Sequence, residues 1–276
     1  MKNNNSSRFL LKYGGNAMRS PELQRAVINN ISQLRDRGHQ VVLVHGGGPF
    51  IKNVLELARI ESTFIDGHRK TTPEALKYIE MALKGEVNGN LVRLCNRAGL
   101  KAVGLSGKDG AMVTAKKRYH RRRENGRDIE HDLGQVGDVA AIDPSLVDIL
   151  LKNDYLPVVT CLASDADGND FNINADMFAG HLAGALKVDR YLVLTDVDGL
   201  LRDVNDPGSL ITALNLKELE RLSGSVIVGG MIPKLESCRI ALEKGARMAC
   251  IVNGTKPDYL LRAATSQQFI GTTINA

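Results

Sequence analysis

The sequence predicts an α/β protein built on a mainly parallel sheet that helices cover on both faces. Strand-like and helix-like segments alternate along the 276 residues. Several strand-like segments, such as "LPVV" and "YLVLT", are continuous apolar runs, which indicates strands buried on both faces. With 43% hydrophobic residues, the chain is large enough for one domain or two closely packed lobes.

Hydroxyl residues followed by proline mark the starts of two expected helices. Ser20 and Thr72 each precede a proline, which places an N-cap side chain before a residue suited to the first helical position. The expected helices lie at residues 20–38, 49–60, 72–99, 143–154, 174–186 and 229–245. The expected strands lie at residues 8–14, 40–46, 101–107, 155–162, 190–197 and 247–254.

A basic stretch lies within an expected hairpin over residues 112–138, whose tight turn is Asn125-Gly126. Its basic residues are Lys116, Lys117, Arg118, Arg121, Arg122 and Arg123. We interpret the stretch either as a solvated loop or as a docking surface for an anionic partner. Nucleic acid is not an expected partner, because no nucleic-acid-binding motif accompanies the charge.

The cysteine pattern and the absence of long apolar runs indicate a cytoplasmic protein. The four cysteines are scattered without a C-x-x-C motif and lie in apolar segments, at residues 95, 161, 238 and 250. Buried free thiols are typical of a reducing compartment. No run reaches the ~18 apolar residues of a membrane span, and the start has no signal-peptide core. We therefore expect no membrane association.

Glycines and lysines gather just after the expected strands, where parallel sheets bind ligands. These residues are Lys12, Gly14, Gly15, Gly46, Gly47, Gly48, Gly229, Gly230 and Lys234, together with polar residues at Asn172, Asn174, Asp176, Thr195, Asp196 and Asp198. Glycine loops at helix N-termini expose backbone N–H groups that favour oxyanions. The pattern therefore predicts a site for phosphate groups and a carboxylate substrate.

Several common nucleotide and metal motifs are absent from the sequence. There is no G-x-x-x-x-G-K-[ST] loop and no G-x-G-x-x-G after the first strand. No H-R-D or D-F-G motif of protein kinases occurs, and no H-E-x-x-H or paired Cys/His cluster suggests a metal site.

Ten stretches in a fixed order from residue 12 to about 254 resemble a known family. They are "KYGGNAM", "VHGGGP", "DGHRKTTPEAL", "GEVNGNLV", "AVGLSGKDG", "DLGQVGDV", "LPVV", "NINADMFA", "LTDVDGLL" and "GGMIPKLESCRIALEKGA". The sequence resembles the amino acid kinase family, and within it the enzymes that phosphorylate N-acetyl-L-glutamate in arginine biosynthesis. The resemblance implies a three-layer αβα sandwich and a homodimer. It also implies that residues 1–188 bind the acylated amino acid and form the dimer contact. Residues 189–276 would bind ATP, as the second lobe of one continuous domain.

The resemblance also implies a role for each candidate residue. Lys12 and Lys234 flank the transferred phosphoryl group, and Asp176 holds both lysines. The backbones of Gly14, Gly15, Gly47 and Gly48 contact the ATP phosphates and the substrate γ-carboxylate. Further substrate contacts are expected from Arg69, Asn172 and Asn174. The nucleotide pocket is expected at Thr195, Asp196, Asp198, Gly199, Leu200, Ile227, Val228 and Gly229. ATP would carry the Mg²⁺, so no protein metal ligand is expected.

Three departures from the family pattern leave alternatives open. His68 and Lys70 flank Arg69 where the family has apolar residues. The chain lacks the N-terminal helix and C-terminal histidine motif of arginine-inhibited members, so we expect an arginine-insensitive enzyme. The basic stretch would suit an acidic carrier protein, which makes a kinase of carrier-bound α-aminoadipate or glutamate the leading alternative, beside one acting on N-succinyl-glutamate. An alternative of another class is a non-catalytic protein that senses a metabolite.

Overall fold

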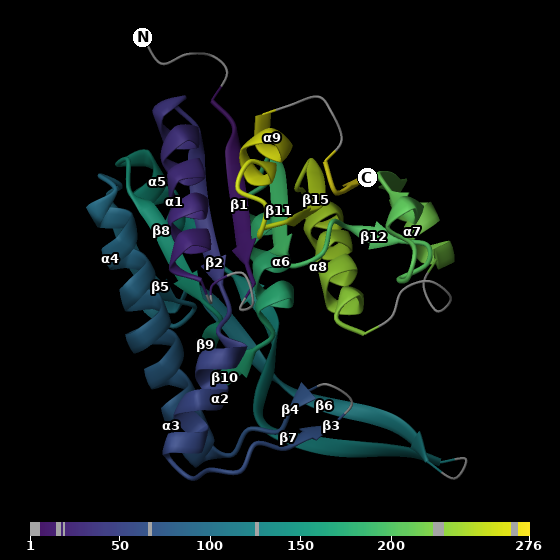
Figure 1. The fold of residues 1–276 in the computed structure, drawn as a ribbon. Helices are drawn as coiled ribbons and strands as arrows, with labels where there is room; N and C mark the ends of the chain where they lie inside the picture. The colour runs from purple at the N-terminus through teal and green to yellow at the C-terminus, as the bar shows by residue number, and fades with distance from the viewer. Residues whose placement is uncertain are drawn as a thin grey trace.

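The computed structural model describes residues 6–14, 18, 20–65, 68–124, 127–222, 229–265 and 270–276. Its centre is an eight-stranded sheet in the order β14-β16-β15-β11-β1-β2-β8-β5 (Figure 1). The strands are β1 (Arg8–Tyr13), β2 (Gln40–His45), β5 (Ala102–Ser106), β8 (Leu156–Thr160), β11 (Arg190–Thr195), β14 (Ala213–Asn215), β15 (Met248–Asn253) and β16 (Thr272–Asn275). All neighbours run parallel except β15 and β16, which confirms the predicted sheet.

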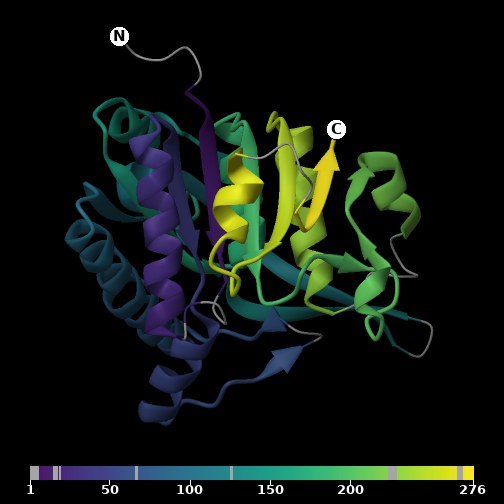
Figure 2. The same cartoon turned by 45° about the horizontal axis from the view of Figure 1, so that its top comes forward.

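Helices cover both faces of this sheet and complete a three-layer sandwich. Alternate residues of β1 belong to different cores, since Leu10 packs into one and Leu11 into the other. The core that contains Leu11 is covered by α1 (Pro21–Asp36), α4 (Gly89–Arg97) and α9 (Tyr259–Thr265). Figure 2 shows α1 and α9 on the near face of the sheet. The opposite core is covered by α2 (Gly48–Leu57), α3 (Pro73–Glu80), α5 (Ser145–Lys152), α6 (Ala175–Ala185), α7 (Leu216–Leu222) and α8 (Met231–Glu243).

The long helix predicted over residues 72–99 forms, but its middle has a different register. Thr72 caps its start by accepting a hydrogen bond from the backbone N–H of Ala75 at 3.1 Å. Between α3 and α4 the chain continues as a π-helix, η2 (Met81–Asn88). A π-helix is wider than an α-helix and is frequent at functional sites. Gly85 and Gly89 weaken the α-helical preference of this segment.

The predicted hairpin is a long ribbon of β6 (Val113–Glu124) and β7 (Arg127–Ile142) that projects from the body (Figure 1). The turn residues 125–126 lie outside the described part. At its base, β9 (Leu162–Ser164) and β10 (Asp170–Ile173) join it in a small closed sheet. Ion pairs across the described part of the ribbon include Lys117–Asp132, Arg118–Asp138 and Arg121–Glu130. The two strands carry seven basic and five acidic residues, so most of the basic charge is offset locally.

Several short elements also occur in the described part of the chain. They are the strands β3 (Phe64–Ile65), β4 (His68–Arg69), β12 (Leu200–Leu201) and β13 (Leu210–Ile211), and the 3-10 turns η3 (Asp109–Ala111) and η4 (Pro207–Ser209). Within the residues that the structure describes, no helix has the length and apolarity to cross a membrane.

Candidate active site

The carboxyl edge of the sheet brings together two lysines from opposite ends of the chain. Lys12 lies in β1, Asp176 in the first turn of α6 and Lys234 in α8. The Nζ atom of Lys12 is 2.7 Å from Oδ1 of Asp176, and the Nζ atom of Lys234 is 3.2 Å from Oδ2. The Asp176 carboxylate therefore bridges the two ammonium groups.

Burial makes this bridge electrostatically strong. Lys12 and Asp176 are each only 5% exposed. Burial alone would raise the pKa of the Asp176 carboxyl, but Lys12 and Lys234 together lower that pKa below its ordinary value. Burial, and next the charge of Lys12, lower the pKa of Lys234. The aspartate therefore stays ionised, and its single negative charge offsets part of the repulsion between the two ammonium groups.

Close packing of α6 against α8 sets the distance between Asp176 and Lys234. Gly180 lies one helical turn after Asp176, and a Cβ atom there would be 2.4 Å from the backbone oxygen of Ser237. The buried hydroxyl of Tyr191 lies 3.1 Å from Oγ of Ser237 and donates to the backbone oxygen of Asp176 at 3.4 Å. A glycine contact and a tyrosine bridge therefore fix the two helices at the level of the ion pair.

The three glycines after β2 begin α2 beside this cluster. A Cβ atom on Gly46 would lie 3.3 Å from Cβ of Ala175, the first residue of α6. Gly47 is the N-cap of α2, and the described part of the chain supplies no acceptor for the N–H groups of Gly47 and Gly48. The start of a helix leaves such donors free and carries a partial positive charge. The loop can therefore bind an oxyanion.

The first glycine segment follows Lys12 directly. A Cβ atom on Gly14 would lie 3.0 Å from the backbone oxygen of Leu194 and 3.7 Å from Nζ of Lys12. Glycine is needed here because β11 approaches closely, and it leaves the backbone open beside the ammonium group. The next candidate, Gly15, lies outside the described residues.

Arg69 of β4 and Asn172 of β10 lie in segments that meet neighbouring residues of β7. Thr71, two residues after Arg69, pairs with Gly134, and Asn172 of β10 pairs with Val136. The guanidinium of Arg69 lies 4.6 Å over the ring of Phe64 and donates to Oγ of Ser62. Its half-buried setting lowers its pKa through desolvation.

The two asparagines proposed as substrate contacts have different surroundings. The described residues provide no hydrogen-bond partner for the half-buried side-chain amide of Asn172. The Oδ1 atom of Asn174 instead caps α6, because it accepts from the N–H groups of Asp176 and Met177 at 2.9 and 3.2 Å. The structure thus gives Asn174 a helix-capping contact and leaves the amide of Asn172 available.

Residues 198–200, in the candidate nucleotide segment after β11, are held by contacts with other parts of the protein. Lys256 and Asn253 hold the carboxylate of Asp198 at 2.9 and 2.8 Å. A Cβ atom on Gly199 would lie 2.6 Å from Oγ1 of Thr272, which also accepts from the N–H of Leu200. These contacts order the segment.

The other candidate nucleotide residues lie at the end of β11 and before α8. Thr195 is the buried last residue of β11, and the exposed Asp196 follows it. Gly229 has a φ of 55°, and a Cβ atom there would meet nothing within 4 Å. Ile227 and Val228 lie outside the described residues.

Comparison with known proteins identifies the family. The pattern of the "Amino acid kinase family" matches residues 7–253. The chain belongs to the amino acid kinase family. An acetylglutamate kinase of Methanococcus maripaludis is 40% identical over 97% of this chain and 91% of its own length, and one of Heliobacterium modesticaldum is 43% identical over 96% and 90%.

A solved structure supports the same fold. N-acetylglutamate synthase from Neisseria gonorrhoeae superposes with a TM-score of 0.82 at 21% identity, covering 98% of this chain and 59% of that one. This superposition confirms the predicted three-layer fold. The family match and the relatives confirm the prediction of a kinase, and the use of ATP follows from the family. Among the residues that the structure describes, no group of three His, Cys, Asp or Glu could hold a metal ion.

The sequence interpretation missed several residues that shape this kinase site, namely His45, Asn88, Gly180, Tyr191 and Ser237. Gly180 had a signal, since "GHLAG" places two glycines four residues apart on one helix face, a pattern that allows close helix contact. The other four gave no local signal, because the contacts His45–Asn88 and Tyr191–Ser237 join residues that are distant in the sequence.

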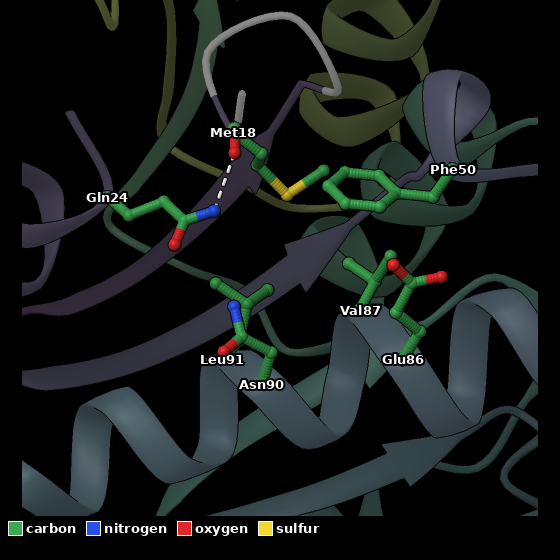
Figure 3. Close-up of a pocket in the computed structure, with 7 residues that line it drawn as sticks. All are labelled: Met18, Gln24, Phe50, Glu86, Val87, Asn90 and Leu91. Atoms are coloured by element: carbon green, nitrogen blue, oxygen red, sulfur yellow. Dashed lines mark hydrogen bonds between the residues drawn. The ribbon is translucent and has the colours of Figure 1, made fainter. Parts of the chain in front are cut away.

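A small cavity of about 250 Å³ lies between the segment after β1 and the start of α2 (Figure 3). Its lining residues are Met18, Gln24, Phe50, Glu86, Val87, Asn90 and Leu91. The Gln24 amide donates to the backbone oxygen of Met18 at 2.5 Å, and the Met18 and Phe50 side chains face one another. Val87 also contacts the glycine loop, since a Cβ atom on Gly47 would lie 3.4 Å from it. The cavity thus adjoins the glycine loop at the start of α2.

Proposed function

We propose that this kinase transfers the γ-phosphoryl group of ATP to the γ-carboxylate of N-acetyl-L-glutamate, which gives N-acetyl-L-glutamyl 5-phosphate and ADP. The observation that carries the proposal is the buried bridge of Lys12, Asp176 and Lys234 beside the glycine loop of α2. The relatives named acetylglutamate kinase, at about 40% identity over nearly the whole chain, favour this acceptor.

The reaction needs charge compensation rather than a general base. A substrate carboxylate with an ordinary pKa of about 4.3 is already ionised at neutral pH. Its approach to an anionic phosphate is opposed by charge repulsion, and phosphoryl transfer depends mainly on positioning and electrostatic stabilisation. Lys12, Lys234 and the N–H groups of Gly47 and Gly48 can offset the negative charge that is shared in the transition state.

Asp176 has a positioning role in this proposal. Its two oxygens hold the two ammonium groups on either side of one carboxylate, and each oxygen serves one lysine. The carboxylate therefore fixes the positions of both ammonium groups, so their N–H donors stay directed into the site rather than turning towards solvent. Mg²⁺ bound to the ATP phosphates would add further positive charge.

Arg69 is proposed to hold the α-carboxylate of the acceptor. A planar guanidinium can bind both oxygens of a carboxylate at once. The guanidinium lies over the ring of Phe64, and the nearby β10 carries Asn172 with an available amide. We propose that residues 1–188 bind the acceptor and residues 189–276 bind ATP. We further propose a cytoplasmic homodimer that acts in the second step of arginine biosynthesis and is insensitive to arginine.

The proposal is tested by ADP release with Mg-ATP and a panel of acceptors: N-acetyl-L-glutamate, N-succinyl-L-glutamate, L-glutamate, N-acetyl-α-aminoadipate, UMP and carbamate. Hydroxylamine traps an acyl phosphate as a hydroxamate. Fast turnover with a trapped hydroxamate on N-acetyl-L-glutamate supports the proposal. Faster turnover on another acceptor refutes it, and ligand binding without any turnover supports a metabolite sensor instead.

A further inference from the structure

The side chain of His45 is completely buried beneath the glycine loop, yet both of its ring nitrogens have partners. Its Nδ1 lies 2.9 Å from the backbone oxygen of Gly46, and its Nε2 lies 2.9 Å from Nδ2 of Asn88. The same Asn88 nitrogen is 2.9 Å from the backbone oxygen of Val158 in β8. The imidazole therefore connects the loop to the π-helix η2 and to the sheet.

The partners fix the protonation of this ring. The oxygen of Val158 can only accept, so the Asn88 atom facing it is the NH₂ nitrogen, which also donates to Nε2 of His45. The oxygen of Gly46 likewise only accepts, so Nδ1 carries the proton. Burial lowers the pKa of His45 to about 4, with the charge of Lys84 acting in the same direction. The ring is therefore neutral at physiological pH.

Holding the Gly46 oxygen sets the direction of the next donor. The peptide unit is planar and trans, so the C=O of Gly46 and the N–H of Gly47 point in opposite directions. The N–H of Gly46 is itself fixed by the backbone oxygen of Tyr13, and the oxygen of Gly47 accepts from Ile51 inside α2. With the Gly46 oxygen held towards the buried ring, the Gly47 N–H is directed away from the core.

The π-helix provides the fit on the other side of the loop. A Cβ atom on Gly47 would lie 2.6 Å from Cδ2 of Leu83, and a Cβ atom on Gly104 would lie 2.1 Å from Oδ1 of Asn88. Leu83 and Asn88 both belong to η2. The local widening of the helix thus places one residue against the loop and another against β5, while the Asn88 amide still reaches His45.

We propose that His45 and Asn88 act together as positioning residues for phosphoryl transfer, by holding the Gly46 carbonyl in the core so that the N–H of Gly47 faces the reacting oxyanions. The proposal rests on phosphoryl transfer at this site but not on the identity of the acceptor. It predicts that the two residues affect the chemical step and not the binding of either substrate.

The test compares His45→Phe, His45→Gln and Asn88→Ala with the control Val42→Ala. The control removes buried methyl groups from the same strand, and Val42 takes no part in the hydrogen bonds of His45 and Asn88. Loss of one preorganised donor typically lowers the rate about 10²–10³-fold. His45→Phe should therefore lower kcat about 100-fold with each KM within about threefold. His45→Gln should recover at least a tenth of the wild-type rate, because its amide can both donate and accept.

A double variant separates positioning from general loss of stability. If the two residues act as one unit, His45→Phe with Asn88→Ala should be no more than a few-fold slower than His45→Phe alone. The proposal would be overturned if the rate losses of the two single variants multiply in the double variant. It would also be overturned if Val42→Ala has the same Tm as His45→Phe and loses as much kcat. If His45→Phe does not fold, His45→Gln and Asn88→Ala carry the test, and unchanged kcat in Asn88→Ala refutes it.

The wild-type enzyme distinguishes failure of this proposal from failure of the proposed acceptor. If wild type is inactive on N-acetyl-L-glutamate, the variants are compared on the acceptor that the panel identifies, or on slow ATP hydrolysis. If His45→Phe then hydrolyses ATP as fast as the wild type, the positioning role is overturned.

Discussion

Replacing Gly180 with alanine tests whether the contact between α6 and α8 sets the catalytic distance. The added Cβ atom would lie 2.4 Å from the backbone oxygen of Ser237, and an ordinary contact needs at least 3.4 Å. The helices must therefore separate by about 1 Å. The Lys234–Asp176 distance of 3.2 Å would then lengthen to about 4 Å, beyond hydrogen-bonding range.

The two effects of Gly180→Ala on the enzyme differ in size. Overpacking costs about 1–3 kcal/mol, and alanine returns about 0.5–1 kcal/mol through its better helix propensity. We therefore expect a net loss of at most about 2.5 kcal/mol in the free energy of unfolding. Activity should suffer more, because a misplacement of about 1 Å near the reacting groups can cost about 100-fold in rate.

The assay is steady-state ADP release beside urea unfolding, with Gly89→Ala as the control. Gly89 is also helical, but a Cβ atom there would meet nothing within 4 Å. The control should keep wild-type kcat and gain about 0.5–1 kcal/mol of stability. Full kcat in a folded Gly180→Ala enzyme would refute the idea that this contact sets the distance between Asp176 and Lys234.

Four further predictions concern the charged groups and regulation. Lys12→Ala and Lys234→Ala should each lower kcat about 10²–10³-fold, whereas a rise in KM alone would exclude their transition-state role. Asp176 has a lowered folded pKa, so its contribution to stability is present above its ordinary value of 3.8 and is lost as the pH falls through the folded value. Asp176→Asn should thus lower the free energy of unfolding by about 3–5 kcal/mol near neutral pH. Urea titrations should show the difference from wild type closing below pH 4, and a difference that stays constant with pH would contradict this assignment. Arg69→Lys should raise the KM of the acceptor about tenfold or more and leave that of ATP unchanged, since hydrogen bonds to charged groups contribute about 1.5–3 kcal/mol. Millimolar L-arginine should leave the rate unchanged, and strong inhibition in the same assay would disprove arginine insensitivity.

The positions of the strands and of the three charged residues followed from local patterns. Lys12 stands near the end of an apolar strand, and parallel strands end at one edge, so its meeting with residues after other strands could be expected. The capping pairs at Ser20 and Thr72 located two helix starts, because a cap depends only on neighbouring residues. Local chemistry was enough in each case.

Features that depend on distant partners could not be predicted in this way. The His45–Asn88 bond joins residues 43 positions apart, and the π-helical register depends on packing against β5 and the glycine loop. The basic stretch looked highly charged because its compensating acidic partners lie on the following strand, across the ribbon. Asn174 caps α6, a local use that an asparagine before a helix also predicts, and its substrate contact stays a prediction.

The central place of β1 in the sheet has a consequence during synthesis of the chain. Its first neighbour, β2, follows within 40 residues, but its second neighbour, β11, pairs Phe9 with Arg190. At about 5–20 residues per second, the ribosome needs roughly 10–40 s to make the intervening chain. During that time an apolar strand edge is open to unwanted pairing. The strand that carries Lys12 is therefore the place where a nascent chain most needs protection from aggregation.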